Sequence, residues 1–392
     1  MYKRQGLSFL ENYLNNIRWG SLKVRFQKKD ERIYQGSQSG LNADLTINDS
    51  SLIRDIVLKG ELGFAEGFIN NKWSTSNLSS VLKVLLKNQK ENNLLLKPYF
   101  YLKLLEKIKF FFKKNSIYQA KKNIEFHYDL GNDFYSKWLD KTMSYSSALY
   151  ENQELNLIDA QNKKYENIIH NLDIKNDDHI CEIGTGWGGF INTILKQNKK
   201  TNFSGYTISK NQFEYVQTEI PLKETNLDLN LLDYRKIEKK FDKIISIEMF
   251  EAVGQKYWDT YFDKIYHSLN NEGKVCLQII TINDASFNHY ADNVDFIQKY
   301  IFPGGMLPSK SILLKLFKKH KLELYHQKDF GHDYAKTLIE WKKRFNENWP
   351  AIKNTKFDER FNKIWNYYFD YCETGFSLNH TDVSQFYLRK VA

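Results

Sequence analysis

The stretch CEIGTGWGGF, residues 181–190, decides the fold, because it places a glycine-rich turn between an apolar run and a helical pattern. Gly184 and Gly186 permit a tight turn and allow a ligand to approach the backbone closely. Together with Gly189 they satisfy the G-x-G-x-x-G spacing of dinucleotide-binding turns, and turns of this kind serve several nucleoside cofactors. The stretch therefore predicts a strand–turn–helix unit that binds a nucleoside cofactor.

The residues around this turn alternate between strand and helix patterns from about residue 124 onward. Apolar residues recur at helical spacing between the apolar runs, as at Phe190, Ile194 and Leu195. Repeated β–α units predict an α/β fold with a parallel, doubly wound sheet that binds its ligand at the carboxyl ends of the strands. The expected strands are HICEI (179–183), FSGYTI (203–208), LDLNLL (227–232), FDKIISI (241–247) and KVCLQII (274–280).

The end of the second expected strand argues against a dinucleotide. A dinucleotide site needs an acid there to hold the ribose hydroxyls. The sequence GYTISKNQ (205–212) offers Thr207, Ser209 and Gln212 instead, and the nearest upstream acid is Glu182, inside the glycine-rich stretch. Thr207 and Ser209 could also simply cap the next helix.

The third expected strand is followed by LDYR (232–235). Asp233 is placed to meet an adenine amine, and Tyr234 to cover the adenine face. This set of residues fits S-adenosylmethionine, which has no pyrophosphate, better than NAD.

The chain of 392 residues carries a formal charge of +10. A basic balance of this size favours a polyanionic partner, either nucleic acid or an anionic membrane surface. The sequence has neither a basic nucleic-acid motif nor zinc-finger spacing, and its nine histidines show no metal-ligand spacing, so we expect no metal. The cysteines Cys181, Cys276 and Cys372 are odd in number and far apart, which argues against a disulfide scaffold and favours a reducing compartment.

The N-terminal sequence MYKRQGLSFLENYLNN does not form a secretory apolar region, because Glu11 and several asparagines interrupt it. The longest apolar runs of the chain fall far short of a membrane-spanning helix. We therefore expect a cytoplasmic protein that visits the inner face of the membrane as a peripheral protein.

Three segments are expected along the chain: a small N-terminal domain over residues 1–100, a basic aromatic linker helix over 101–123, and the α/β domain over 124–392. The linker sequence KLLEKIKFFFKKNSIYQAKK (103–122) interleaves lysines with aromatic residues. This pattern is typical of a helix that lies on anionic lipid. A surface helix packed on its domain, with solvated lysines, is the alternative.

Six strings in fixed order carry a resemblance to a known family. They are HYDLGNDFYSKWLDKTMSYSSA (127–148), EIGTGWGGF (182–190), GYTISKNQFEY (205–215), IEMFEAVG (247–254), YIFPGGMLPS (300–309) and DFGHDYAKTLIEW (329–341). They resemble the cyclopropane-fatty-acyl-phospholipid synthases and their mycolic-acid-modifying relatives over nearly the whole chain, most weakly before residue 30. The resemblance implies a Rossmann-like, seven-stranded methyltransferase domain behind a smaller N-terminal α+β domain that engages lipid and takes part in a homodimer.

The same resemblance implies which residues hold S-adenosylmethionine. Tyr145 and Ser146 match a Tyr-Ser pair of the family's cofactor site. The remaining cofactor positions match Gly184, Gly186, Thr207 and Gln212, with Asp233 and Tyr234 near the adenine.

The implied reaction transfers the sulfonium methyl carbon to a double bond in a phospholipid acyl chain. Water must be excluded from the carbocation, and a dry aromatic pocket would do this. Ring closure then needs a base, and the family uses a bound bicarbonate. The matching holders are Ser147, Glu251, Gln278, Ile280 and Tyr334.

Two of these positions depart from the commonest pattern, because Ser147 replaces a cysteine and Gln278 replaces a histidine. Both replacements keep hydrogen-bonding groups. If the base is lost, the cation could end as a methyl-branched chain, so a methyltransferase that acts on another lipid or small acceptor is an alternative. A non-catalytic lipid-binding protein is an alternative of a different class. Cys372 matches a cysteine once assigned as active in the family, and we interpret it as a buried structural thiol.

Overall fold

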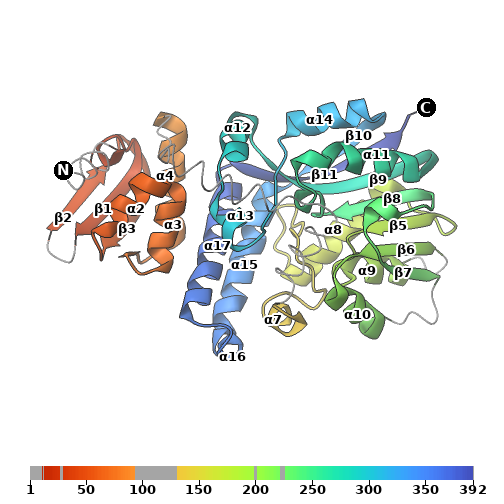
Figure 1. Cartoon of the computed structure of the whole chain (residues 1–392), viewed down its shortest axis with the longest axis horizontal. Coiled ribbons are helices and arrows are strands. Elements are labelled where there is room, and N and C mark those ends of the chain that lie inside the picture. The colour runs from red at the N-terminus through yellow and green to blue at the C-terminus, as the bar shows by residue number, and fades with distance from the viewer. Residues whose placement is uncertain are drawn as a thin grey trace. The chain divides into compact units, whose positions relative to one another are not determined.

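The computed structural model describes residues 11, 13–26, 30–92, 130–197, 201–220 and 226–391. The expected linker helix over residues 101–123 lies outside this part of the chain. The chain folds into two compact units, both seen in Figure 1. The first comprises Met1–Phe112, Asp292–Ile301 and Ile352–Leu378, and the second comprises Lys113–Ala291, Phe302–Ala351 and Asn379–Ala392.

The second unit is built on a seven-stranded sheet with the order β10-β11-β9-β8-β5-β6-β7. Strands β5 to β9 pair in parallel, whereas β11 pairs antiparallel with both β9 and β10. This arrangement confirms the predicted Rossmann-like, seven-stranded sheet. The strands are β5 (His179–Ile183), β6 (Asn202–Thr207), β7 (Leu227–Leu231), β8 (Phe241–Ile247), β9 (Leu269–Ile282), β10 (Leu322–Asp329) and β11 (Thr381–Lys390).

Helices cover both faces of this sheet (Figure 1). Because side chains alternate along a strand, β5 sends Cys181 and Ile183 to one face and Ile180 to the other. The first face packs against α11 (Trp258–Ser268) and α14 (Lys310–Lys319), and the second against α8 (Leu157–Leu172), α9 (Gly189–Gln197) and α10 (Lys210–Glu219). The sheet is therefore the buried middle layer, as expected of a mainly parallel sheet.

The shorter elements of the second unit lie mainly in the connections between strands. They are α7 (Asn132–Ser136), η2 (Tyr234–Lys236), η3 (Phe250–Ala252), η4 (Gln255–Tyr257), α12 (Asp284–Asp292) and α16 (Trp349–Ile352), together with the longer α15 (Gly331–Glu347). Two of the five predicted strands, β5 and β8, have the bounds expected from the sequence. Strand β9 begins earlier than predicted, at Leu269, because that residue pairs with Phe241 of β8.

The first unit contains a four-stranded sheet with the order β2-β1-β3-β4. Its strands are β1 (Trp19–Phe26), β2 (Asp30–Gln35), β3 (Gln38–Ile47) and β4 (Trp73–Ser74), and its helices are α2 (Ser51–Lys59), α3 (Glu61–Ile69), α4 (Leu78–Asn92), α13 (Phe296–Tyr300) and α17 (Glu359–Ser377). A Cβ on Gly63 would lie 2.1 Å from the Asp55 carbonyl oxygen, so the backbones of α2 and α3 approach each other closely at this glycine.

The first unit is discontinuous in sequence, which the linear division at residues 100 and 123 did not anticipate. Glu66 of α3 accepts hydrogen bonds from Lys299 and Tyr300 of α13. Glu373 of α17 pairs with Lys83 of α4 at 2.6 Å. Hydrogen bonds and an ion pair therefore hold late segments of the chain in the N-terminal unit.

Among the described residues, none of the helices combines the length and the apolar character that crossing a membrane requires.

Candidate active site

The glycine-rich turn joins β5 to α9 at the carboxyl edge of the sheet. Gly184 and Gly186 have φ values of +86° and +52°, in the left-handed region that favours glycine. A Cβ on Gly184 would lie 2.9 Å from the Met249 side chain, whereas a Cβ on Gly186 would meet open space. The turn is therefore tight on one side and open on the other, as a ligand-binding turn requires.

Two buried polar atoms beside this turn have no hydrogen-bond partner in the described part of the chain: Oε2 of Glu182 and Oγ1 of Thr185. Burial raises the pKa of Glu182 well above its ordinary value, although the nearby charge of Lys164 opposes the shift. Unsatisfied polar atoms next to an open glycine turn fit a polar ligand such as a nucleoside.

The residues that follow β6 make mainly local contacts. Ser209 caps the N-terminus of α10, where its side chain accepts a hydrogen bond from the Gln212 amide at 3.4 Å. Thr207 Oγ1 donates to Gln212 Oε1 at 3.2 Å. The capping alternative is thus confirmed for Ser209, and the predicted cofactor roles of all three residues stay predictions.

Asp233 follows β7, and both of its carboxylate oxygens accept hydrogen bonds from Arg235, at 2.8 and 2.6 Å. Tyr234 packs edge-on against Tyr261, with ring centroids 5.3 Å apart. The arginine neutralises the carboxylate and orients it. Asp233 and Tyr234 therefore lie at the sheet edge where an adenine was expected, and contact with adenine stays a prediction.

Ser146 is anchored by a buried lysine that the sequence did not single out. Lys164 of α8 donates to Ser146 Oγ and to Gln161 Oε1, both at 2.6 Å, and Gln161 donates to the Ser146 carbonyl at 2.9 Å. Burial lowers the pKa of Lys164 to about 7, against the opposing pull of Glu248 and other carboxylates. Lys164 and Gln161 therefore position the Tyr-Ser segment of the expected cofactor site.

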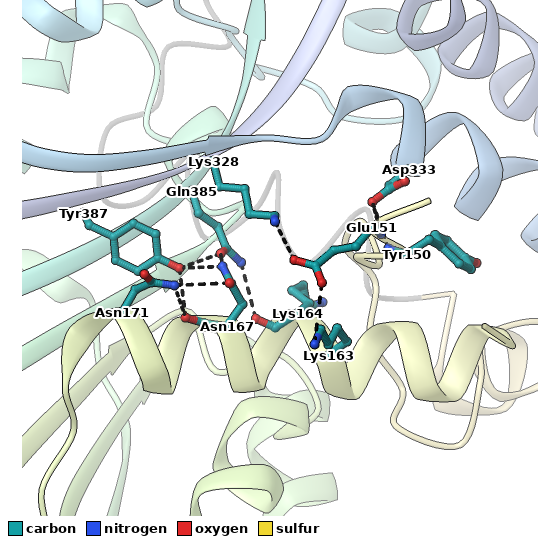
Figure 2. Close-up of polar contacts among 10 residues, drawn as sticks. All are labelled: Tyr150, Glu151, Lys163, Lys164, Asn167, Asn171, Lys328, Asp333, Gln385 and Tyr387. Carbon is teal, nitrogen blue, oxygen red and sulfur yellow. Dashed lines mark hydrogen bonds and ion pairs between the residues drawn. The ribbon is translucent and has the colours of Figure 1, made fainter. Parts of the chain in front are cut away.

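The segment that carries Tyr145, Ser146 and Ser147 is also fastened to α15. Asp333 accepts hydrogen bonds from the backbone of Tyr150 and Glu151, and the first of these is visible in Figure 2. Thr337, one turn along α15, accepts from the Ala148 amide at 3.1 Å. Since Tyr334 lies on the same helix, these contacts fix its position relative to residues 145–148.

Glu248 is the centre of the candidate active site. It directly follows β8 in the left-handed region, at a φ of +49°. Its carboxylate accepts three hydrogen bonds: from the Ser147 amide at 2.9 Å, from Gln278 Nε2 at 2.8 Å and from the Tyr334 hydroxyl at 2.7 Å. Three donors and a strained backbone at the carboxyl end of a strand are typical of a functional carboxylate.

Glu251 lies one turn further along, in η3. Its Oε1 accepts from the Ile280 amide at 2.5 Å, while its buried Oε2 has no hydrogen-bond partner in the described part of the chain. Burial, and secondly the charge of Glu248, raise the pKa of Glu251 to about 8. Burial also raises the pKa of Glu248, but its three donors counteract that shift.

These neighbouring carboxyl groups therefore have different roles in proton chemistry. Glu248 is surrounded by donors, which favour its ionised form. Glu251 has one free oxygen and titrates close to neutral pH, so it can give up or accept a proton there. A buried carboxyl group with a free oxygen, next to a second carboxylate that several donors satisfy, is typical of an acid–base site.

The structure brings all five residues predicted to hold bicarbonate into this cluster, but their hydrogen bonds are mostly taken up. The Ser147 amide, the Gln278 amide and the Tyr334 hydroxyl donate to Glu248, and the Ile280 amide donates to Glu251. The Ser147 hydroxyl donates to the Ala148 carbonyl at 3.0 Å. Among the side-chain atoms of these five residues, Oε2 of Glu251 is the buried atom that has no hydrogen-bond partner in the described part of the chain.

Aromatic rings surround Tyr145 next to the carboxylates. Its ring centroid lies 5.4 Å from each of Tyr135, Trp138 and Trp341, and Tyr334 contacts Trp341 edge-on at 6.0 Å. Trp138 and Trp341 are fully buried. Such a cluster excludes water and offers ring faces to a cation, as the expected chemistry requires.

Cys372 lies on α17 in the first unit, whereas the other candidate catalytic residues lie in the second. Burial, and secondly the charge of Asp295, raise its pKa, so the sulfur stays a thiol at neutral pH. A thiol is a poor nucleophile. These observations favour the structural role over the catalytic one.

Two important residues, Glu248 and Lys164, were missed by sequence reasoning. Glu248 stands directly after a predicted strand, at the edge where a parallel sheet binds its ligand, so its position carried a usable signal. Lys164 falls at helical spacing among buried positions such as Ala160, Tyr165 and Ile168, where a charged residue is unusual. Either pattern could have marked the residue as functional.

The strand order, the glycine turn and the carboxylates at the sheet edge together define the class of Rossmann-like, S-adenosylmethionine-dependent methyltransferases. Comparison with known proteins identifies the family. Residues 115–386 match the model of the mycolic acid cyclopropane synthetase family. The chain belongs to this family.

Individual relatives agree with this assignment. The chain is 32% identical over 342 residues to the cyclopropane-fatty-acyl-phospholipid synthase of Escherichia coli, covering 85% of this chain and 84% of the relative. It is 30% identical over 349 residues to the tuberculostearic acid methyltransferase UfaA1 of Mycobacterium tuberculosis, covering 86% and 81%. The structure of mycolic acid cyclopropane synthase CmaA1, complexed with SAH and CTAB, is 27% identical with a TM-score of 0.63, covering 69% of this chain and 98% of that one.

Proposed function

We propose that this protein transfers the methyl carbon of S-adenosylmethionine to the cis double bond of phospholipid acyl chains and closes a cyclopropane ring. The observation that carries the proposal is the buried Glu248–Glu251 pair beside the glycine turn. An acyl-chain alkene has no acidic proton, so a base is needed only after the methyl group has been transferred. A buried carboxyl group with a free oxygen and a pKa of about 8 suits that late step.

The residues around the turn fit the cofactor. The unpartnered oxygens of Glu182 and Thr185 and the open side of Gly186 leave room and polar contacts for a nucleoside. S-adenosylmethionine, when bound, supplies an electrophilic methyl group on a positively charged sulfur. The chain's own residues must hold the alkene in line with that methyl group, and the aromatic cluster around Tyr145 excludes water from the resulting cation.

The ring-closing step balances with Glu251 as the proton acceptor. The alkene π electrons form the bond to the methyl carbon as the carbon–sulfur bond breaks. A C–H bond of the new methyl group then supplies the electrons of the second ring bond, and its proton passes to Oε2 of Glu251. The negative charge of Glu248 raises the proton affinity of Glu251.

Bicarbonate remains a prediction of the family resemblance. The groups expected to donate to it already donate to Glu248 and Glu251, so no step here is assigned to it. Turnover in buffer depleted of carbon dioxide and then resupplied with bicarbonate measures its contribution. We expect the depleted enzyme to keep most of its activity, and a strict requirement for added bicarbonate would assign the base to the anion instead.

The proposed function is tested by incubating the purified chain with S-adenosylmethionine and vesicles of unsaturated phospholipid. Mass spectrometry should show acyl chains that have gained one CH2 unit and resist ozonolysis. Recovery of the lipid unchanged, although calorimetry shows that the protein binds the cofactor, would overturn the proposal.

Methyl branching is the second candidate function, because Ser147 and Gln278 depart from the commonest pattern and one relative of similar identity is named a methyltransferase. The same assay separates the two. A methylene-branched product has the mass of the ring but is cleaved by ozone, and a product reduced to a methyl branch has gained two further hydrogens.

We also propose that the partner is an anionic phospholipid bilayer rather than nucleic acid, and that the protein acts as a peripheral protein on the inner face of the membrane. The charge of +10 and the lysine-rich sequence over residues 101–123 support this. Neutralising Lys107, Lys109, Lys113 and Lys114 together should weaken sedimentation with anionic vesicles and leave cofactor affinity unchanged. Unaltered sedimentation would exclude this segment as the docking element.

A further inference from the structure

A buried row of polar side chains leads away from Glu248 and ends on α8. Gln278 donates to Glu248 Oε1 at 2.8 Å and accepts at its own Oε1 from Gln385 Nε2 at 3.0 Å. Gln385 Oε1 accepts from the Tyr387 hydroxyl at 2.6 Å and from Asn167 Nδ2 at 2.7 Å. Figure 2 shows the outer part of this row, where Gln385 and Tyr387 of β11 meet Asn167 of α8.

The direction of every hydrogen bond in this row follows from its first member. An ionised carboxylate only accepts, so Gln278 must turn its NH2 group toward Glu248. Its carbonyl oxygen then faces Gln385, which must present its own NH2 group. The oxygen of Gln385 is left facing Tyr387 and Asn167, both of which can donate. Each amide therefore has one favourable orientation.

Burial makes this orientation consequential. Gln278, Gln385 and Tyr387 are each 0% exposed, so water does not compensate a flipped amide. If Gln278 turned over, its carbonyl oxygen would face the Glu248 carboxylate, and two acceptors would repel each other. An unsatisfied group at this depth is costly.

We propose that Gln385 is a positioning residue for the reaction: it acts through Gln278 to keep Glu248 as the ionised member of the carboxylate pair, which leaves Glu251 as the group that exchanges a proton. This inference rests on the proposed function and extends it to a residue near the end of the sequence. Gln385 needs no contact with cofactor or lipid to do this.

The charged and titratable groups around the row come from several elements. Lys164 and Tyr165 face it from α8, Cys276 from β9 and Tyr334 from α15, with Glu251 beyond Glu248. Gln385 Nε2 also donates to the Lys164 carbonyl at 3.4 Å. Gln385 therefore also contacts α8, and an experiment must distinguish the effect of this contact from the effect of Gln385 on Gln278.

A double-mutant cycle makes that separation. Gln385→Leu keeps the side-chain size and removes the donor that orients Gln278. We expect kcat to fall about ten-fold, since Gln278 is then no longer held with its NH2 group toward Glu248, and the KM for cofactor to stay unchanged. If Gln385 acts through Gln278, then Gln385→Leu should cause no further loss in a Gln278→Leu background. Additive losses in the double variant would overturn the inference.

Gln385→Glu provides the conservative rescue. A protonated glutamic acid donates from one oxygen and accepts at the other, as the amide does, so this variant should approach wild-type kcat on the acidic side and lose it as the new carboxyl group ionises. A flat loss equal to that of the leucine variant at all pH values would contradict the proposal.

Ser384→Ala is the matched control. Ser384 is a buried neighbour on β11 that points to the other face of the sheet and donates to Asp329 at 2.6 Å. The Ser384→Ala variant should have a lower melting temperature but should not show the kcat loss expected of Gln385→Leu. If the wild-type chain modifies no lipid, the proposed function fails; if the wild type is active and the cycle is additive, only the role of Gln385 fails.

Discussion

Glu251→Gln is the substitution that tests the acid–base site most directly. Glutamine keeps the oxygen that accepts from the Ile280 amide and removes the group that titrates at about pH 8. Loss of a general base costs about 100- to 10,000-fold in kcat, whereas the cofactor contacts are left in place. We therefore expect a large fall in kcat with unchanged cofactor affinity.

Wild-type kcat should change with pH by a magnitude that follows from the pKa of Glu251. With a pKa of about 8, roughly one tenth of Glu251 is ionised at pH 7 and roughly nine tenths at pH 9. If ionised Glu251 accepts the proton, wild-type kcat should rise about ten-fold over that interval. The assay is methyl transfer to unsaturated vesicles, measured from pH 6 to 9 by mass spectrometry.

The stability of the same variant provides a readout that does not depend on turnover. In the folded protein the pKa of Glu251 is about 8, well above the ordinary value of about 4.5 for a glutamate. The contribution of this group to folding stability is therefore complete below pH 4.5 and is lost as the pH rises toward 8. A difference of about 3.5 units, at about 1.36 kcal/mol per unit, limits the loss to about 5 kcal/mol. Relative to wild type, Glu251→Gln should therefore become more stable as the pH rises.

Asp295→Asn is the control for removing a buried carboxyl group. Burial raises the pKa of Asp295 to about 6, and asparagine keeps the capping contact at the N-terminus of α13. This variant should leave the turnover midpoint near pH 8 in place. A Glu251→Gln enzyme that turns over within two-fold of wild type, with an unchanged pH profile, would refute the assignment of Glu251 as the base.

Four further substitutions test the surrounding site. Tyr334→Phe removes a donor to Glu248 and should cost about 1–3 kcal/mol of unfolding free energy in urea titrations, with reduced kcat; unchanged values for both would deny the contact any role. Gly184→Ala and Gly186→Ala should each weaken cofactor binding in calorimetry, because the first adds a Cβ 2.9 Å from the Met249 side chain and the second adds one on the open side proposed for the nucleoside, both at a positive φ that disfavours alanine. Unchanged affinity in either variant would contradict the proposed turn geometry. Cys372→Ala should keep kcat within about two-fold of the wild-type value, because a protonated thiol is a poor nucleophile. A large loss of kcat would indicate that Cys372 takes part in catalysis.

Much of the fold could be predicted from local sequence. The runs HICEI and FDKIISI became β5 and β8 with the predicted bounds, because mainly apolar runs between polar turns have few alternatives in a doubly wound sheet. The discontinuous first unit could not be predicted in this way. The contacts of Glu66 with α13 join positions more than two hundred residues apart, and no local pattern encodes that pairing.

The candidate site, too, could be predicted from the sequence only in part. The sequence by itself determined the glycine turn and the residue types at the sheet edge, because backbone conformation and strand periodicity are local properties. Only the tertiary structure decided that Glu248 receives three donors from three distant segments while Glu251 keeps a free oxygen. The protonation of each carboxyl group depends on burial and on neighbours brought together by folding, and two glutamates three residues apart carry no such information in their order along the chain.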